Sequence, residues 1–262
     1  MTDLATPHAQ PSPPRHACWS AACLLLGLYV AVLAVAAATL PAAERGLVVF
    51  LLAAECVAIA TVVPFLAARS REGDRRAARA MCVLLPTLGL AVASLVIVSI
   101  VGRGAVPVGT VAWAQLFLLA FALALVGLVA LLASFGIRPT TAQLAASLVG
   151  LAMIGNVFFA NSLVEAPESE GAKTLAIDVT LWTNPWLIVG GTILEADPLR
   201  NEAIYSFSVI IYYGFRYPAA SAGGVGARAL SVAAPYAACG LGLHAVAWLV
   251  AWIRRRGRPG GG

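Results

Sequence analysis

Six long apolar stretches dominate the sequence and limit what it can fold into. They cover approximately residues 18–40, 46–67, 81–101, 110–134, 142–163 and 230–253. A helix needs roughly 20 apolar residues to cross a bilayer, so each stretch can span one. Charged residues make up only 11% of the chain, which is too few to cover a water-soluble protein. The sequence therefore predicts an all-α membrane protein with six transmembrane helices, and it excludes a soluble enzyme, a disordered chain and a disulfide scaffold.

The first apolar stretch has a second interpretation, as a secretory signal peptide, because alanine-rich sequence follows it. Its apolar core exceeds the roughly 7–15 residues of a signal h-region, and another apolar stretch follows at once. We therefore expect residues 18–163 to hold transmembrane helices 1–5 and residues 230–253 to form helix 6.

Arginine is concentrated in the segment after the second stretch and in the tail after the sixth: Arg69, Arg71, Arg75, Arg76, Arg79, Arg254, Arg255, Arg256 and Arg258. The connectors after the first and third stretches hold only Arg45 and Arg103. Short arginine-rich segments remain cytoplasmic. We therefore expect two cytoplasmic termini, with residues 1–17 as a flexible tail and 254–262 as a basic tail. The single lysine and frequent alanine are typical of high-GC bacteria, which places the protein in the bacterial cytoplasmic (inner) membrane as a multi-pass protein.

The longest segment outside the six stretches, residues 164–229, falls on the outer face in this topology. Its start, Glu165 to Lys173, is polar and predicts a loop. The apolar pieces Trp182–Leu194 and Ala203–Phe215 follow, and both are too short to span. Asn184-Pro185 opens the first piece and Asp197-Pro198 separates the two, as turn and helix-start signals. We predict a re-entrant helical hairpin that packs against helices five and six, with a pair of strands or a small folded cap as the alternative.

Two ionisable residues lie inside the apolar stretches, Glu55 and His244. Such residues are costly in a membrane, so they are candidates for function. The pair could relay protons or hold a substrate, or each could be hydrogen-bonded to a neighbouring helix. From residue type alone, Asn156 and Asn161 favour hydrogen bonds between helices over a polar path.

The recognised catalytic motifs are missing. The sequence has no G-x-x-x-x-G-K-[ST], no G-x-S-x-G and no H-E-x-x-H. Two of the three histidines, His8 and His16, lie in the N-terminal tail. We therefore expect a protein that is not an enzyme, binds no metal and no cofactor, and has no nucleic-acid partner, since topology accounts for its arginines.

The basic connector Arg69–Arg79 has two interpretations. It is either a solvated loop that contacts anionic lipid headgroups or a docking element for a cytoplasmic partner. Charge alone favours the first.

Taken together, this layout resembles the permease subunit of a type-2 ATP-binding-cassette exporter. That family has six spans, cytoplasmic termini, a docking stretch between spans two and three, and a re-entrant hairpin between spans five and six. The segment L-L-A-S-F-G-I-R-P-T-T-A-Q-L-A (131–145) is similar to the family's turn between spans four and five. The Pro-rich residues 1–17 depart from the family's amphipathic first helix, and only Arg71-Glu72-Gly73 echoes its docking signature.

The resemblance implies a homo- or heterodimer of permease subunits that docks on a separate cytoplasmic ATPase subunit, within the lipid bilayer. It implies docking residues Arg69, Arg71, Glu72, Arg75, Arg76 and Arg79. It also implies a translocation path along Glu55, Asn156 and Asn161. The outer gate hairpin would hold Asn184, Pro185, Trp186, Asp197, Pro198, Tyr205 and Tyr212. Two other functions remain open: a structural or assembly subunit of a larger membrane complex, and a proton-coupled carrier or membrane enzyme that uses Glu55 and His244.

Overall fold

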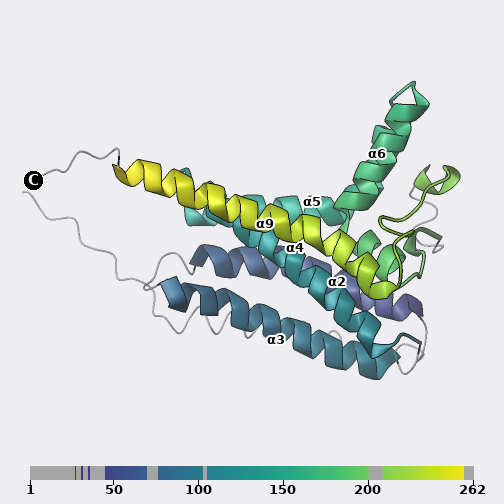
Figure 1. The fold of residues 1–262 in the computed structure, drawn as a ribbon, viewed down its shortest axis with the longest axis horizontal. Coiled ribbons are helices and arrows are strands. Elements are labelled where there is room, and N and C mark those ends of the chain that lie inside the picture. Colours follow the sequence, from purple (N-terminus) through teal and green to yellow (C-terminus); the bar gives the residue numbers. More distant parts are fainter. Residues whose placement is uncertain are drawn as a thin grey trace, which may run out of the picture.

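The structure, a computed structural model, describes residues 45–69, 76–102, 105–200 and 209–256, together with the single residues 27, 31 and 35. Within these ranges the chain is helical and forms no strand (Figure 1). The alternative of paired strands in the outer segment is therefore not found over residues 209–215, the part of the second predicted piece that is described.

Five helices in the described ranges are long and apolar enough to cross a membrane. They are α2 (Arg45–Arg69), α3 (Arg76–Gly102), α4 (Val108–Ser134), α5 (Pro139–Glu165) and α9 (Val225–Arg256). Each contains one of the predicted stretches and extends beyond it at one or both ends. The first predicted stretch, residues 18–40, lies outside the described residues apart from three isolated positions.

The turn between α4 and α5 forms as its residues predict. Gly136 ends α4 with a φ of +83°, a left-handed conformation that favours glycine. Pro139 is the first residue of α5, where its missing N–H costs nothing. Arg254, near the end of α9, donates hydrogen bonds to the carbonyl oxygens of Ser134 (2.8 Å) and Phe135 (3.0 Å). This contact satisfies carbonyls that the end of α4 leaves free.

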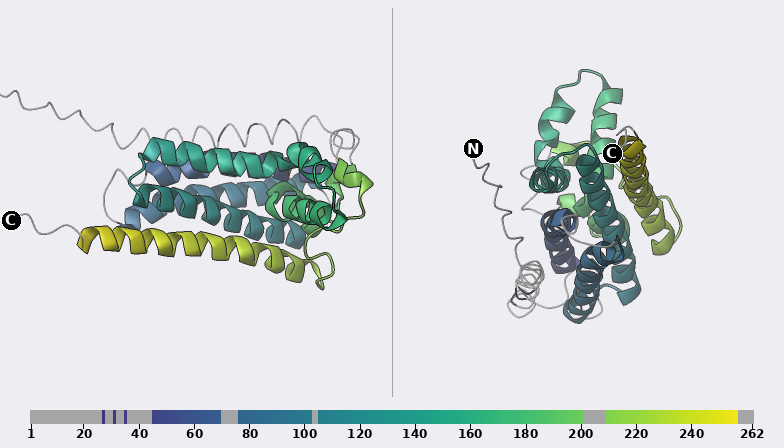
Figure 2. Two further views of the ribbon diagram at one scale, coloured as in Figure 1. Left: turned by 90° about the horizontal axis from the view of Figure 1, so that it is seen from above. Right: turned by 90° about the vertical axis from the view of Figure 1, so that its left-hand side faces the viewer.

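Helix α4 packs most extensively against α9, and α2 packs most extensively against α5. Small residues allow the close approach: a Cβ added at Gly240 would lie 2.8 Å from the backbone of Leu123. One turn closer to the start of α9, large rings fill the space between the two helices. There Tyr236 of α9 contacts Phe117 and Phe121 of α4 edge-on. The helices run side by side along the long axis of the molecule (Figure 2).

We call the end of the bundle that carries residues 166–224 the outer end, after the orientation that the arginines predict. The elements there are α6 (Glu170–Thr183), α7 (Pro185–Leu187), the π-helix η1 (Ile188–Ile193) and the 3₁₀ turns η2 (Pro198–Arg200) and η3 (Val209–Tyr212). The start of η2 at Pro198 and of α7 at Pro185 agrees with the two predicted start signals.

The loop predicted over residues 165–173 is shorter in the structure, residues 166–169, because α5 extends to Glu165 and α6 begins at Glu170. Ser169 caps this helix by accepting a hydrogen bond from the backbone N–H of Ala172 (3.3 Å). Lys173 contacts Glu170 at 2.8 Å, and this hydrogen bond raises the pKa of the lysine above its ordinary value. Polar side chains here stabilise a helix start rather than marking a loop. Trp182 and Thr183, which were predicted to open the next apolar piece, are the last two residues of α6.

Helix α6 and the last turns of α5 form an antiparallel pair, which we call the arm (residues 157–183). Val157, Ala160 and Val164 of α5 share a buried cluster with Ile177 and Leu181 of α6. Helix α6 leaves the bundle at a steep angle and meets it short of the outer ends of α2 and α9 (Figure 1). The arm was not predicted, because apolar periodicity does not reveal where a helix leaves a bundle.

Candidate functional site at the outer end of the bundle

After α6 the chain turns into the bundle through residues 184–194, which we call the inserted segment. It comprises Asn184, α7, η1 and Leu194, and all but two of its residues are buried. Leu187, Ile188 and Val189 are each fully buried. A polar loop would not be buried in this way, so this segment is part of the protein core.

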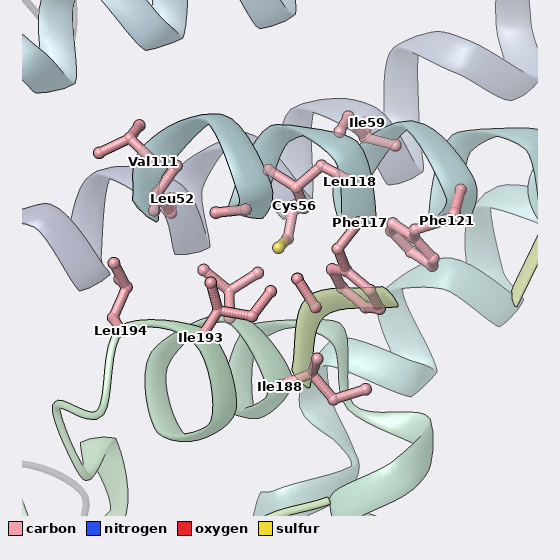
Figure 3. Close-up of a cluster of buried hydrophobic side chains, with 14 of the residues drawn as sticks. Leu52, Cys56, Ile59, Val111, Phe117, Leu118, Phe121, Ile188, Ile193 and Leu194 are labelled. Carbon is pink, nitrogen blue, oxygen red and sulfur yellow. The ribbon is translucent and has the colours of Figure 1, made fainter. Parts of the chain in front are cut away.

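The inserted segment contacts four long helices, α2, α4, α5 and α9. Ile188, Ile193 and Leu194 belong to one buried cluster with Leu52 and Cys56 of α2 and with Val111 of α4 (Figure 3). Cys56 lies about three helical turns from the outer end of α2. The segment therefore fills the bundle to a depth of several turns. The predicted contact with the sixth span is found as packing of the inserted segment on α9, and the contact with the fifth span is found as packing of Ile210, in the next piece, on α5.

Two glycines let the backbone of the inserted segment approach its neighbours closely. A Cβ at Gly191 would lie 2.2 Å from the ring of Tyr217, and one at Gly190 would lie 2.9 Å from the Pro198 ring. The Tyr217 hydroxyl donates to the Asp197 carboxylate at 2.7 Å. The predicted gate residues Asp197 and Pro198 are therefore brought onto the inserted segment by a tyrosine that sequence reasoning missed.

Asn184 joins the inserted segment to α5, and both polar atoms of its side chain are used. Its Oδ1 accepts from the backbone N–H groups of Trp186 (3.0 Å) and Leu187 (3.1 Å), which caps α7. Its Nδ2 donates to the Ile154 carbonyl (2.9 Å) and to Asn156 Oδ1 (2.8 Å). This is the full capacity of an asparagine side chain.

Asn156 continues this network into α6. Its Nδ2 donates to Thr183 Oγ1 at 2.8 Å and to the Thr180 carbonyl at 3.2 Å. The hydrogen bonds between helices that residue type favours at Asn156 are thus confirmed. We call Asn156, Thr183 and Asn184 the asparagine junction.

Further contacts hold the outer end together. The Thr192 hydroxyl donates to the Pro218 carbonyl at 2.9 Å, and the Tyr236 hydroxyl donates to the Trp182 carbonyl at 3.0 Å. Arg228 of α9 forms an ion pair with Glu195 directly after the inserted segment. Trp186 packs against both the bundle core and the arm core. Inserted segment, arm base and α9 are therefore linked to one another by side chains.

A second polar cluster lies between α2, α3 and α4. Glu55 Oε2 accepts from Ser94 Oγ (2.5 Å) and from Gln115 Nε2 (2.8 Å), and all three residues are buried. Glu55 Oε1 and Gln115 Oε1 are buried without a hydrogen-bond partner. The cluster, which we call the glutamate cluster, agrees with the prediction that Glu55 is hydrogen-bonded to neighbouring helices.

The structure does not bring Glu55 and His244 into one hydrogen-bonded pair. His244 Nδ1 lies 2.8 Å from the Gly240 carbonyl of its own helix, and the ring packs beside Gly127 of α4. The polar contacts of Glu55 are instead with α3 and α4. A proton relay between the two residues thus lacks a direct contact among the described residues.

The remaining predicted site residues lie apart from these clusters. Arg69 ends α2, and Arg76 and Arg79 lie in the first turn of α3, so the α2–α3 connector is shorter than the predicted docking stretch. Arg71, Glu72, Arg75 and Tyr205 lie outside the described residues. Tyr212 is exposed in η3, and Asn161 is half-buried on α5.

Comparison with known proteins finds no matching family model, no similar curated protein and no similar solved structure.

Proposed function

We propose that this protein is the membrane permease subunit of an ATP-driven exporter of the ATP-binding-cassette type, and that it pairs with a separate ATPase subunit. One observation carries the proposal. Between its last two long helices, α5 and α9, the chain folds back into the outer end of the bundle. The family resemblance implies an exit gate at that place in the sequence.

In this proposal the inserted segment is the gate. It packs on α2, α4 and α9 at once, so a change in the spacing of these helices changes its packing. The close contacts at Gly190 and Gly191 leave no room for small adjustments. A well-packed contact of this kind moves between discrete arrangements rather than deforming gradually. Separation of the long helices would then release the segment and open the outer end.

The force that separates the long helices would come from the ATPase, acting at the arginine-rich end of the bundle. The connector between Arg69 and Arg76 is short, and it joins two helices that reach toward the outer end. A push on this connector by a closing ATPase would therefore move α2, which contacts the inserted segment directly. Docking at Arg69–Arg79 would in this way act on the inserted segment through α2.

Copurification tests the proposal. The protein is isolated from its native membrane in mild detergent, and its partners are identified by mass spectrometry. We expect a P-loop ATPase and a second permease subunit. The absence of any P-loop ATPase from the purified complex would overturn the proposal.

A matched pair of variants locates the docking face. Reversing two charges of the connector, with Arg75→Glu and Arg76→Glu together, should reduce the recovered ATPase severalfold. The same change at the other basic end, with Arg255→Glu and Arg256→Glu, serves as the control and should leave recovery unchanged. Equal recovery with both variants would place the ATPase contact elsewhere.

A second candidate function, a structural or assembly subunit of a larger membrane complex, is favoured by the exposed apolar face of α3. Leu84, Leu88, Val92 and Val96 recur on one side of this helix and are about half exposed among the residues that the structure describes. A stable complex of other membrane proteins that lacks an ATPase would support this function over the first.

A further inference from the structure

The arm has apolar side chains on two opposite faces. Ile177 and Leu181 of α6 face α5 and are buried. Leu175, Val179 and Trp182 recur at helical spacing on the other side, and the first two are 63% and 52% exposed. One face therefore holds the arm together, and the second is exposed in the part of the chain that the structure describes.

The α5 half of the arm adds to this exposed surface. Phe158 and Phe159 are 51% and 69% exposed in the part of α5 that pairs with α6. They continue the exposed apolar residues Leu144, Leu148 and Leu151 on the preceding turns of the same helix. In a helix that crosses a membrane, such a row faces the lipid chains. The α5 half of the arm thus continues a lipid-facing row of the same helix, and α6 adds a second exposed apolar side.

Polar residues are concentrated at the far end of the arm. Glu165, Glu168 and Glu170 are exposed around the turn between α5 and α6, and Lys173 follows one turn later. Asp178 is exposed on the flank of the apolar row. This distribution, apolar along one face with charges at the tip and flank, is typical of a helix that lies at a membrane interface.

The direction of the arm agrees with such a position. The long helices run along the long axis of the molecule, while α6 diverges from them, and the end of α6 meets the bundle short of the outer ends of α2 and α9 (Figure 1). The asparagine junction fixes this departure, because Asn184 holds the Ile154 carbonyl in the middle of α5. The base of the arm is therefore at the depth of the bundle, and its tip points away from it.

We propose that the arm is a lipid-binding element, whose exposed apolar side chains, Leu175, Val179 and Trp182 on α6 and Phe158 and Phe159 on α5, lie in the acyl chains of the outer leaflet. The acidic tip lies at the headgroup level. The arm would anchor the outer end of the bundle sideways in the bilayer. This inference depends on the protein spanning a membrane and not on the exporter function, so either can fail without the other.

Site-specific photocrosslinking tests the proposal. A benzophenone amino acid is introduced at one position at a time in the full chain, which is then reconstituted into phosphatidylcholine nanodiscs. Adducts formed on irradiation are identified by mass spectrometry. Position 175 is the test, position 148 on α5 is the lipid-facing control, and position 170 at the acidic tip is the polar control.

We expect phospholipid adducts at position 175 in an amount similar to position 148, and severalfold less at position 170. A protein–protein adduct at position 175 would overturn the proposal and show that a second copy covers this face. Equally low lipid adducts at 175 and 170, beside strong adducts at 148, would overturn it by placing the arm in water.

A substitution gives an independent check that does not depend on the probe. Val179→Asp places a charge in the middle of the exposed face and leaves the Ile177–Leu181 contact with α5 intact. With the probe at position 175, this variant should reduce lipid adducts severalfold, while adducts at position 148 stay unchanged and report an intact bundle. Undiminished adducts at 175 would contradict insertion of this face.

Discussion

The asparagine junction and the glutamate cluster are both buried in a bundle of apolar helices, yet they satisfy their polar atoms very differently. Every polar atom of the Asn184 side chain has a partner. In the glutamate cluster one oxygen of Glu55 and one of Gln115 have none. An unpaired buried polar group costs roughly 1–3 kcal/mol. The junction therefore stabilises the fold, whereas the glutamate cluster retains polar groups that the fold does not need.

This difference separates two roles that the sequence could not distinguish. Asn156 and Glu55 were both candidates for a polar path. The structure shows that Asn156 fixes the departure of the arm through Thr183 and Asn184. Its place in a path stays a prediction, and Glu55 becomes the stronger candidate for function because its unpaired oxygen can still accept a partner.

The largest effect is expected for Asn184→Ala. The change removes the cap of α7 and leaves the Ile154 carbonyl and Asn156 Oδ1 without their donor. The free energy of unfolding should fall by roughly 2–4 kcal/mol. Denaturant titration in bicelles measures it. Asn184→Ser is the matched variant, since a serine can still cap α7 but cannot reach α5, and it should lose about half as much. Equal losses in both variants would mean that the link to α5 contributes nothing.

A smaller effect is expected where the same segment is held by close packing alone. In Gly191→Ala the new methyl group overlaps the Tyr217 ring, which must move away from Asp197. We expect a loss of about 1–3 kcal/mol. Gly171→Ala on α6 is the control, because nothing lies within 4 Å of its Cβ position. If Gly191→Ala leaves the free energy of unfolding unchanged, the inserted segment is loosely packed.

Much of this architecture could be predicted because long apolar stretches must be helices in a bilayer. Gly136, Pro139 and Pro185 acted as their residue types predict, since a local backbone preference decides each of them. The arm and the contacts of the inserted segment could not be predicted. They depend on which residues meet across 20 to 60 positions of sequence, as Asn156 and Asn184 or Glu55 and Gln115 do.

Replacement of one partner in the glutamate cluster should lower the free energy of unfolding by less than Asn184→Ala or Gly191→Ala does. Gln115→Leu removes the hydrogen bonds that Gln115 donates to Glu55 and Ser94, but it also removes a buried oxygen that has no partner among the described residues. The two effects oppose each other, and we expect a net loss of about 1 kcal/mol or less. Unfolding in bicelles measures it beside Asn156→Leu, which removes fully paired groups and should cost clearly more. A larger loss of stability in Gln115→Leu than in Asn156→Leu would contradict the conclusion that the asparagine junction stabilises the fold more than the glutamate cluster does.

The smallest effect on stability is expected for Glu55→Gln. A carboxylate without a cation costs several kcal/mol in an apolar interior, so we expect Glu55 to be neutral, and a neutral amide replaces it at nearly equal volume. The amide oxygen can accept from Ser94 and Gln115 as the carboxyl oxygen does. Stability should therefore change by less than about 1 kcal/mol. If Glu55 serves the exporter, ATP hydrolysis by the copurified complex should nevertheless change, because the amide cannot bind and release a proton. Glu55→Gln with unchanged stability and unchanged hydrolysis would leave Glu55 a purely structural residue, and the glutamate cluster would then differ from the asparagine junction only in how completely it is paired.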